Sequence, residues 1–240
     1  MEKVTGIGGV FFRARDPEAL GLWYAEQLGI EQPPATYEGD TWWQELGPTV
    51  WAPFRADTQL FGSPEQAWMI NFRVRDLASI VSQLRAAGAT VEVDPEFYPN
   101  GRFARLMDPE SNPVQLWQPW GRDAGDDVAP EIDLFFRHIE RFNAGVRSGD
   151  FGPMLDQFAD GAELVFEGVP AGPFAGKAAI SAAYASQPPD DEVLLLDQPV
   201  LAAGTVRVSY GWLADRGTAA GEMRLTADGG LINRLVVTFG

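Results

Sequence analysis

Phe12-Arg13-Ala14-Arg15-Asp16 and Phe72-Arg73-Val74-Arg75-Asp76 are two versions of one stretch, 60 residues apart. In each copy an apolar segment leads into an Asp, a helical pattern follows, and a Gly ends it, at Gly29 and at Gly88. Similar segments at a fixed offset indicate an internal repeat. The first half of the chain is therefore predicted to contain two equivalent modules.

The Asp of each copy is expected to cap a helix. Asp16 and Asp76 can accept hydrogen bonds from the free N–H groups at the start of helices predicted over 17–28 and 77–87. Pro17 fits the first helical position, where its missing N–H costs no bond. We therefore assign both Asp residues to capping rather than to catalysis.

Composition excludes several classes of function. The 240 residues are 45% hydrophobic, and 34 acidic against 18 basic side chains give a net charge of −16. Such a surface disfavours nucleic acid and anionic membranes as partners. The absence of cysteine excludes a disulfide framework and a thiol nucleophile. With no signal-peptide pattern and no long apolar run, we expect a cytoplasmic protein.

The other segments of the first half alternate or cluster apolar residues as strands do. A turn is predicted at Asp108-Pro109-Glu110-Ser111-Asn112. We expect strands over 7–14, in two pieces between 41 and 55, and over 68–75, 89–93, 102–107 and 113–118. Each copy then reads as a βαβββ module, and two such modules can pair their sheets around a cleft.

Residues 4–119 resemble the vicinal oxygen chelate superfamily, which includes glyoxalase I, the extradiol dioxygenases and the bleomycin-resistance proteins. The resemblance rests on the two repeated stretches, on Trp23-Tyr24, on Leu84-Arg85-Ala86-Ala87-Gly88, and on the closing Arg102-Phe103-Ala104-Arg105 and Asp108-Pro109-Glu110-Ser111-Asn112-Pro113-Val114-Gln115-Leu116-Trp117. It implies a cleft between tandem modules.

The resemblance also bears on metal binding. Metal-using members hold their ion with His, Glu or Gln, and the corresponding positions here are Gly9, a residue near Ala52, Met69 and Gln115. Gly and Ala offer no ligand atom, and a thioether is too soft for such an ion. The chain has a single histidine, His138, so a two-His-one-carboxylate iron site is excluded. We expect no metal and no other cofactor.

Aromatic and amide side chains are expected to line this cleft. Such a groove would bind a flat organic ligand, whereas the alternative is that half of these residues are core and the cleft is vestigial. Both interpretations stay open. Trp51 is expected in the wall of the cleft, and the candidate substrate-binding residues are Phe11, Trp43, Phe54, Met69, Asn71, Gln115 and Trp117.

Residues 120–130 show no periodicity, so we expect a solvated linker between a domain over 1–119 and another over 131–240. The second domain is predicted to start with a long helix over 131–148 and a short one carrying Met154, Leu155 and Phe158. Strands are expected at 162–167, 192–197, 204–214, 219–227 and 230–239, with a helix at 177–187 after the first. Helices followed by strands indicate an α+β order.

The second half resembles the nuclear transport factor 2-like superfamily, and within it the SnoaL-like polyketide cyclases and ketosteroid isomerases. The resemblance rests on Arg141-Phe142-Asn143, Arg147-Ser148-Gly149-Asp150, Phe158-Ala159-Asp160-Gly161-Ala162, Gly176-Lys177-Ala178-Ala179-Ile180 and the turn at Gly229-Gly230. It implies a cone-shaped, cystatin-like domain. The positions that correspond to the catalytic Tyr and two Asp of the isomerases lie near Phe142, Phe166 and Gly221. The resemblance therefore does not imply the isomerase active site in this chain.

Polar side chains of the second half could line a cavity. His138 has the one ordinary pKa that suits proton transfer near neutral pH, although a lone His at the edge of a buried stripe is also typical of a core. Glu222 and Arg224 share a strand face, either as an ion pair or as a catalytic pair. The candidate catalytic residues are His138 and Glu222, and the candidate substrate contacts are Asn143, Tyr184, Tyr210 and Arg224.

The fold class predicted for the whole chain is α+β, with tandem βαβββ modules followed by an α+β cone. The first function class is a metal-independent protein that binds a small hydrophobic, aromatic or polyketide-like molecule. The second is an acid–base enzyme, a cyclase, isomerase or lyase, acting in the second domain. The third is assembly through dimerising domains, and we expect a homodimer.

Overall fold

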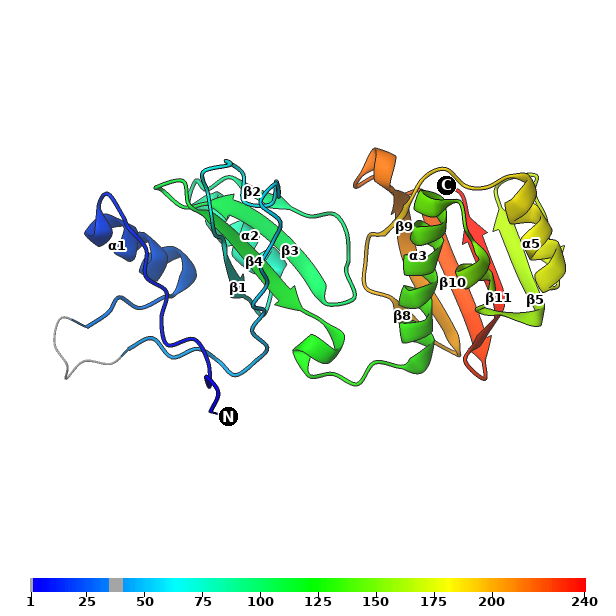
Figure 1. The fold of residues 1–240 in the computed structure, drawn as a ribbon, viewed down its shortest axis with the longest axis horizontal. Coiled ribbons are helices and arrows are strands. Elements are labelled where there is room, and N and C mark those ends of the chain that lie inside the picture. The colour runs from blue at the N-terminus through cyan, green and yellow to red at the C-terminus, as the bar shows by residue number, and fades with distance from the viewer. Residues whose placement is uncertain (1, 35–40) are drawn as a thin grey trace. The chain divides into compact units, whose positions relative to one another are not determined.

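The computed structural model describes residues 2–34 and 41–240. Contacts divide the chain into two compact units, of which unit 1 comprises 1–93 and 103–118 and unit 2 comprises 94–102 and 119–240. Each unit has its own hydrophobic core. The α+β class is confirmed (Figure 1). The limits 1–119 and 131–240, with their linker, stay a prediction.

Unit 1 is built on one four-stranded sheet. Its elements are α1 (Pro17–Leu28), β1 (Ile70–Arg73), α2 (Leu77–Ala86), β2 (Val91–Val93), β3 (Gly101–Met107) and β4 (Pro113–Pro119). The strand order is β1-β4-β3-β2, with β1 parallel to β4 and β2 antiparallel to β3. The second copy of the repeat therefore forms the predicted βαβββ module.

Both helices of unit 1 begin as the repeat predicts. The Asp16 carboxylate accepts a hydrogen bond from the Ala19 N–H at 3.1 Å, and Asp76 accepts one from the Ser79 N–H at 3.0 Å. Gly29 follows α1 with φ of 68°, the left-handed conformation that glycine adopts without strain. The capping assignment is confirmed.

The turn between β3 and β4 holds α1 in place. The Glu110 carboxylate accepts hydrogen bonds from the backbone N–H groups of Arg15 and Asp16, at 2.7 and 2.8 Å. Leu20 and Tyr24 of α1 lie in the same core as the apolar residues of α2. The helix of the first copy is thus packed against the module formed by the second.

The strands expected for the first copy are not formed. No strand occurs over 7–14 or between 41 and 55, and Phe11 and Trp43 are 95% and 85% exposed. A strand needs a partner for its backbone groups, and in the described part of unit 1 the sheet contains strands of the second copy alone. The expected pairing of two sheets around a cleft is therefore replaced by one sheet.

Unit 2 consists of helices and a larger sheet. Its elements are η1 (Gly121–Ala124), α3 (Pro130–Ser148), α4 (Gly152–Leu155), β5 (Phe158–Glu167), β6 (Phe174–Ala175), α5 (Lys177–Ser186), β7 (Val193–Leu195), β8 (Val200–Ala202), β9 (Thr205–Trp212), η2 (Leu213–Asp215), β10 (Gly221–Asp228) and β11 (Leu231–Thr238). Phe158, expected on a helix, instead begins β5. Gly229 and Gly230 make the predicted tight turn, with φ of 58° and 80°.

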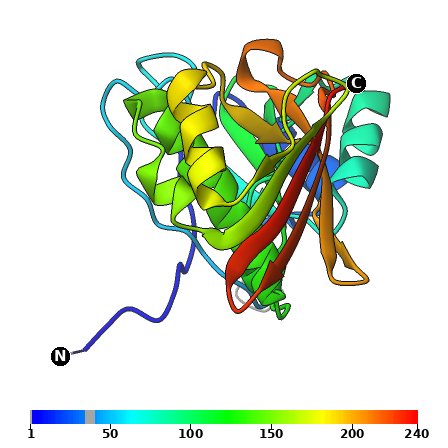
Figure 2. The ribbon, with the colours of Figure 1, turned by 90° about the vertical axis from the view of Figure 1, so that its right-hand side faces the viewer.

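The seven-stranded sheet has the order β6-β5-β11-β10-β9-β7, with β8 paired to β9. Neighbouring strands are antiparallel except β5 and β11, which are parallel. Figure 1 shows α3 lying across the sheet, and Figure 2 shows α5 beside β5. Phe135 and Ile139 of α3 and Ile180 of α5 are buried in the core that these elements share.

The core of unit 2 also includes Phe97, from the connection between β2 and β3. Phe97 is 5% exposed, its N–H donates to the Leu195 carbonyl at 2.6 Å, and its ring meets the Trp120 ring at 5.4 Å. Arg102 Nη2 donates to the Leu196 carbonyl at 3.0 Å. Trp120 itself packs against this core. At least this residue of the expected solvated linker is therefore partly buried.

Candidate ligand-binding groove

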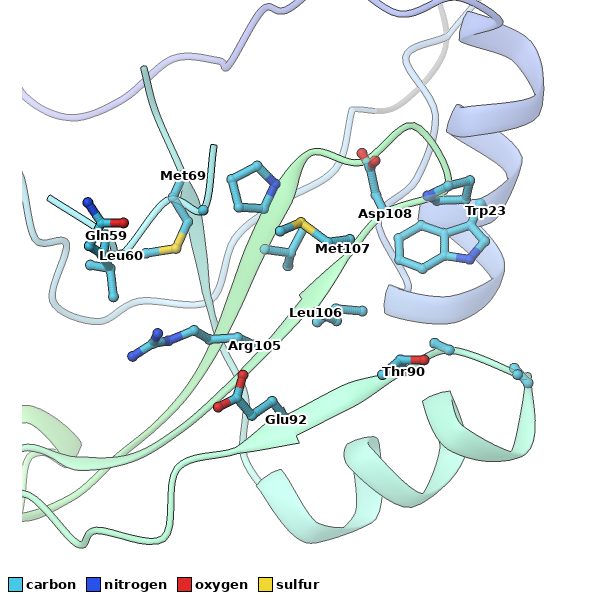
Figure 3. Close-up of a pocket in the computed structure, with 17 residues that line it drawn as sticks. Trp23, Gln59, Leu60, Met69, Thr90, Glu92, Arg105, Leu106, Met107 and Asp108 are labelled. Atoms are coloured by element: carbon cyan, nitrogen blue, oxygen red, sulfur yellow. The ribbon is translucent and has the colours of Figure 1, made fainter. Parts of the chain in front are cut away.

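A groove of about 630 Å³ lies within unit 1 (Figure 3). It is bordered by α1, by the segment before β1, by the connection from α2 to β2, and by β3 with the turn that follows it. Its apolar lining includes Trp23, Leu60, Met69, Leu106 and Met107. A volume of this size lies within the range of ~300–1,000 Å³ that is typical of small-molecule sites.

Asp108 fixes one end of the groove. Its buried carboxylate accepts hydrogen bonds from the Tyr24 hydroxyl at 2.9 Å, from the Glu110 N–H at 2.9 Å, and from the N–H and side-chain amide of Asn112, both at 2.8 Å. Burial, together with this negative charge, raises the pKa of Tyr24. The bond from Tyr24 holds α1 and hence Trp23, so Asp108 serves the architecture of the groove.

Arg105 and Glu92 are the charged side chains of the groove besides Asp108. They are opposite one another on the antiparallel strands β3 and β2. Figure 3 shows the Arg105 side chain on the side of the groove where Gln59, Leu60 and Met69 lie, and pointing away from Asp108 and Trp23. Among the described residues, no hydrogen bond or ion pair engages the Arg105 guanidinium. As far as the described residues show, the groove thus combines apolar walls with a cation that has no partner.

The lining of the groove offers mainly surfaces for contact with a ligand. None of the described residues that border the groove is His, Ser or Cys, so the usual nucleophile–base pairs are not available there. Trp23, Met69 and Met107 offer an aromatic face and two polarizable thioethers, which contact flat ring systems favourably.

The metal site of the resembled superfamily does not fit the residues present. Gly9 and Ala52 carry no donor atom, and Met69 offers a thioether. Gln115 Oε1 accepts a hydrogen bond from Asn71 Nδ2 at 2.7 Å. Across residues 2–34 and 41–240 the structure contains no cluster of three His, Asp or Glu side chains arranged to hold a metal ion.

Of the first-half candidates from the sequence, Met69 lines the groove. Phe11, Trp43 and Trp51 are exposed and lie outside its lining. Phe54 contacts the Phe61 ring at 5.5 Å.

Three other first-half candidates lie on the central strands of the sheet. Asn71 and Gln115 bond to each other across the pair β1 and β4. Trp117 is buried, and its ring stacks on Phe103 at 6.1 Å. These three residues do not line the groove.

His138 is a buried histidine of unit 2. It is 2% exposed, its Nδ1 lies 3.3 Å from Gln157 Oε1, and its ring meets Phe158 edge-on at 5.3 Å. Burial lowers the pKa of His138 to about 4; the Gln157 bond opposes this shift, and the Arg141 charge adds to it. The imidazole is therefore neutral near pH 7 and is held in the core by an amide.

Glu222 and Arg224 lie on the sheet face opposite the core. Met223 and Leu225, which alternate with them, are buried in that core. Arg224 forms an ion pair with Glu167, and its Nε lies 3.5 Å from Glu222 Oε1. Both side chains are partly exposed and form ion pairs on this face of the sheet.

The remaining candidates of unit 2 make structural contacts. Asn143 donates to the Val193 carbonyl at 2.9 Å and accepts from the Val193 N–H at 2.8 Å, which joins α3 to β7. The Tyr210 hydroxyl donates to the Thr238 carbonyl at 3.0 Å. Tyr184 contacts the rings of Phe142 and Phe151. These side chains lie on different elements and do not border the groove.

Sequence reasoning missed Arg105, Glu92 and Trp23 as groove residues. A usable signal existed for the first two, because opposite charges on adjacent predicted strands, 89–93 and 102–107, often face one another across a pair. Trp23 carried no such signal, since its position depends on the hydrogen bond between Tyr24 and Asp108.

Among the described residues, no helix combines the length and the apolar character that crossing a bilayer requires.

Residues 9–117 match the family model of the glyoxalase-like domain. The resemblance predicted for residues 4–119 is therefore confirmed over this segment. No curated protein matches the chain.

Solved structures similar to this chain cover its C-terminal half, where a fold of this kind was predicted. A protein from Sphaerobacter thermophilus is 24% identical, with 45% of this chain and 94% of that chain covered and a TM-score of 0.36. A Δ5-3-ketosteroid isomerase from Mycobacterium sp. is 19% identical, with 47% and 95% covered and a TM-score of 0.36. A putative polyketide cyclase from Sinorhizobium meliloti is 16% identical, with 42% and 93% covered and a TM-score of 0.31.

Proposed function

We propose that this protein binds a small, flat organic molecule in the groove of unit 1, without the help of a metal ion. The observation that carries the proposal is the groove itself, about 630 Å³ in volume and walled by Trp23, Leu60, Met69 and Met107. Concave sites with apolar walls and a few polar groups are the usual form of small-molecule sites. The glyoxalase-like match over 9–117 covers most of the segments that form it.

The alternative, an acid–base enzyme acting in unit 2, has less support. A general base works best with a pKa near the operating pH, whereas burial lowers the pKa of His138 to about 4. Glu222 lies beside Arg224 on the outer face of the sheet. Neither residue has the surroundings of a proton carrier in a closed cavity. The expected homodimer and cytoplasmic location stay predictions.

The test is native mass spectrometry of protein exposed to a lysate of its own host, followed by denaturing release and identification of the bound molecule. Leu60→Trp would fill the groove, and Leu22→Trp is the matched control, because Leu22 is 48% exposed on α1 and outside the lining. We expect the wild-type protein and the control to retain a small molecule and Leu60→Trp to lose it. Equal retention by both variants, or no retention by the wild type, would contradict the proposal.

A further inference from the structure

We propose that the groove selects flat ligands that carry a carboxylate or a similar oxyanion, and that Arg105 binds this group. The inference rests on the proposed function, since it presumes that a ligand enters the groove. It assigns the ligand's chemical class and orientation.

The charge of Arg105 is permanent, and it has no partner among the residues that the structure describes. A guanidinium stays protonated at every physiological pH. In the described part of the chain no carboxylate lies within ion-pair distance of it and no carbonyl accepts from it. The side chain is half-buried at the groove, so part of its hydration has already been lost without compensation. An oxyanion in the groove would supply the missing acceptor in a bidentate geometry.

Glu92 is the nearest competitor for this cation. It lies opposite Arg105 in the strand register but does not form an ion pair with it. Glu92 is exposed, and exposed pairs contribute only ~0–1 kcal/mol. A ligand carboxylate that is shielded by the apolar walls should therefore bind the Arg105 guanidinium in preference to Glu92.

The other charge of the groove favours one orientation. Asp108 lies at the end near Trp23, whereas the Arg105 side chain points away from that end (Figure 3). An anionic group placed beside Asp108 would be repelled, and one beside Arg105 would be attracted. The ring system of the ligand is then left against the apolar side chains Trp23 and Met107.

Binding of 2-naphthoate and of 2-naphthamide, measured by isothermal titration calorimetry at pH 7.5, tests this. The two compounds have nearly the same shape, and only the first is charged, because a carboxyl group ionises near pH 4. Arg105→Gln removes the proposed partner. Arg13→Gln removes the same charge from unit 1 at an exposed position outside the groove.

We expect wild-type protein to bind naphthoate about tenfold more tightly than naphthamide, which corresponds to ~1.4 kcal/mol. Arg105→Gln should abolish this preference, because it weakens naphthoate binding more than naphthamide binding, whereas Arg13→Gln should keep it. Glu92→Gln should tighten naphthoate binding more than naphthamide binding. Equal affinities in the wild type, or a preference that survives Arg105→Gln, would overturn the assignment while leaving the proposed function intact. Failure of both compounds to bind would instead contradict the proposed function.

Discussion

His138 should remain uncharged in the folded protein down to about pH 4, and the stability of unit 2 should depend on pH accordingly. Its pKa is lowered from 6.5 to about 4, chiefly by burial. An unfolded chain binds a proton at this site below pH 6.5, whereas the folded chain does not until about pH 4. This contribution to stability is therefore complete above pH 6.5 and decreases as the pH falls through the window from 6.5 to about 4.

The magnitude follows from the shift. Each pH unit within that window costs about 1.4 kcal/mol, because the unfolded state binds one more proton than the folded state. Going from pH 7.5 to pH 5 should lower the free energy of unfolding by about 2 kcal/mol through His138 alone. No other imidazole contributes, because the chain has a single histidine.

Two measurements check this. The Cε1 proton of the single histidine should show one resonance in ¹H NMR, and its chemical shift should stay constant from pH 8 to pH 5. Urea unfolding of wild type and His138→Gln should give the second readout. Gln at position 138 does not titrate and can still form a hydrogen bond to Gln157. The carboxylates, including Glu96, whose pKa is raised by burial, contribute equally to the pH dependence of both proteins.

We expect the wild type to lose about 2 kcal/mol more than His138→Gln between pH 7.5 and pH 5. A resonance that titrates with a midpoint near pH 6.5 would refute the reasoning, since the imidazole would then be hydrated in the folded state. The same conclusion would follow if the two proteins lost equal stability over this pH interval.

Three further results are expected. Tyr24→Phe removes one hydrogen-bond donor from the buried Asp108 carboxylate and should lower the free energy of unfolding in urea by about 1–3 kcal/mol. Tyr184→Phe should be nearly neutral, because the Tyr184 hydroxyl makes no hydrogen bond among the described residues. Equal losses of stability in the two variants would contradict this. Phe97→Ala should lower the free energy of unfolding by about 3–5 kcal/mol, because it leaves a cavity in the core of unit 2. Phe11→Ala should lower it by less than about 0.5 kcal/mol, because Phe11 is exposed. A larger loss for Phe11→Ala than for Phe97→Ala would contradict the burial of Phe97. Metal analysis of purified protein should find no stoichiometric zinc, iron, nickel or manganese. One equivalent of metal bound within residues 1–119 would contradict the conclusion that Gly9 and Met69 cannot serve as metal ligands.

The elements that the sequence predicted best are those with local determinants. The helix over 17–28 has its cap in Asp16, its Pro at the first position and its Gly29 immediately after the end, and α1 spans the same residues. The turn Gly229-Gly230 likewise depends on two adjacent residues. Such signals lie within a few positions of the structure that they specify.

The strands expected around Phe11 and Trp43 show the limit of this reasoning. Their apolar pattern is that of a strand, but a strand is stable only beside a partner, and the partner's identity is not encoded locally. The groove shows the same limit, because Arg105, Trp23 and Leu60 are far apart in sequence and border one groove only in the folded unit 1. Met69 was recoverable because the family resemblance aligned it with a cleft position, and in the structure it lies immediately before β1.

For Glu222 and Arg224 the sequence left two alternatives, an ion pair and a catalytic pair, and could not decide between them. Strand alternation places both side chains on one face. Which face is covered depends on α3, whose apolar stripe could pack on either side until the connections are known.

The burial of Phe97 has a consequence for how this gene could be divided or recombined. Residues 94–102 lie between β2 and β3 along the chain, yet they belong to unit 2. A fragment that begins at residue 119 lacks the side chain that its core requires, and a fragment that ends at 118 carries an apolar side chain that has lost its burial site. Exposed core surface of this kind promotes aggregation. The boundary between the two units therefore does not fall at a single position in the sequence. A C-terminal unit fused to another domain would need a substitute for Phe97.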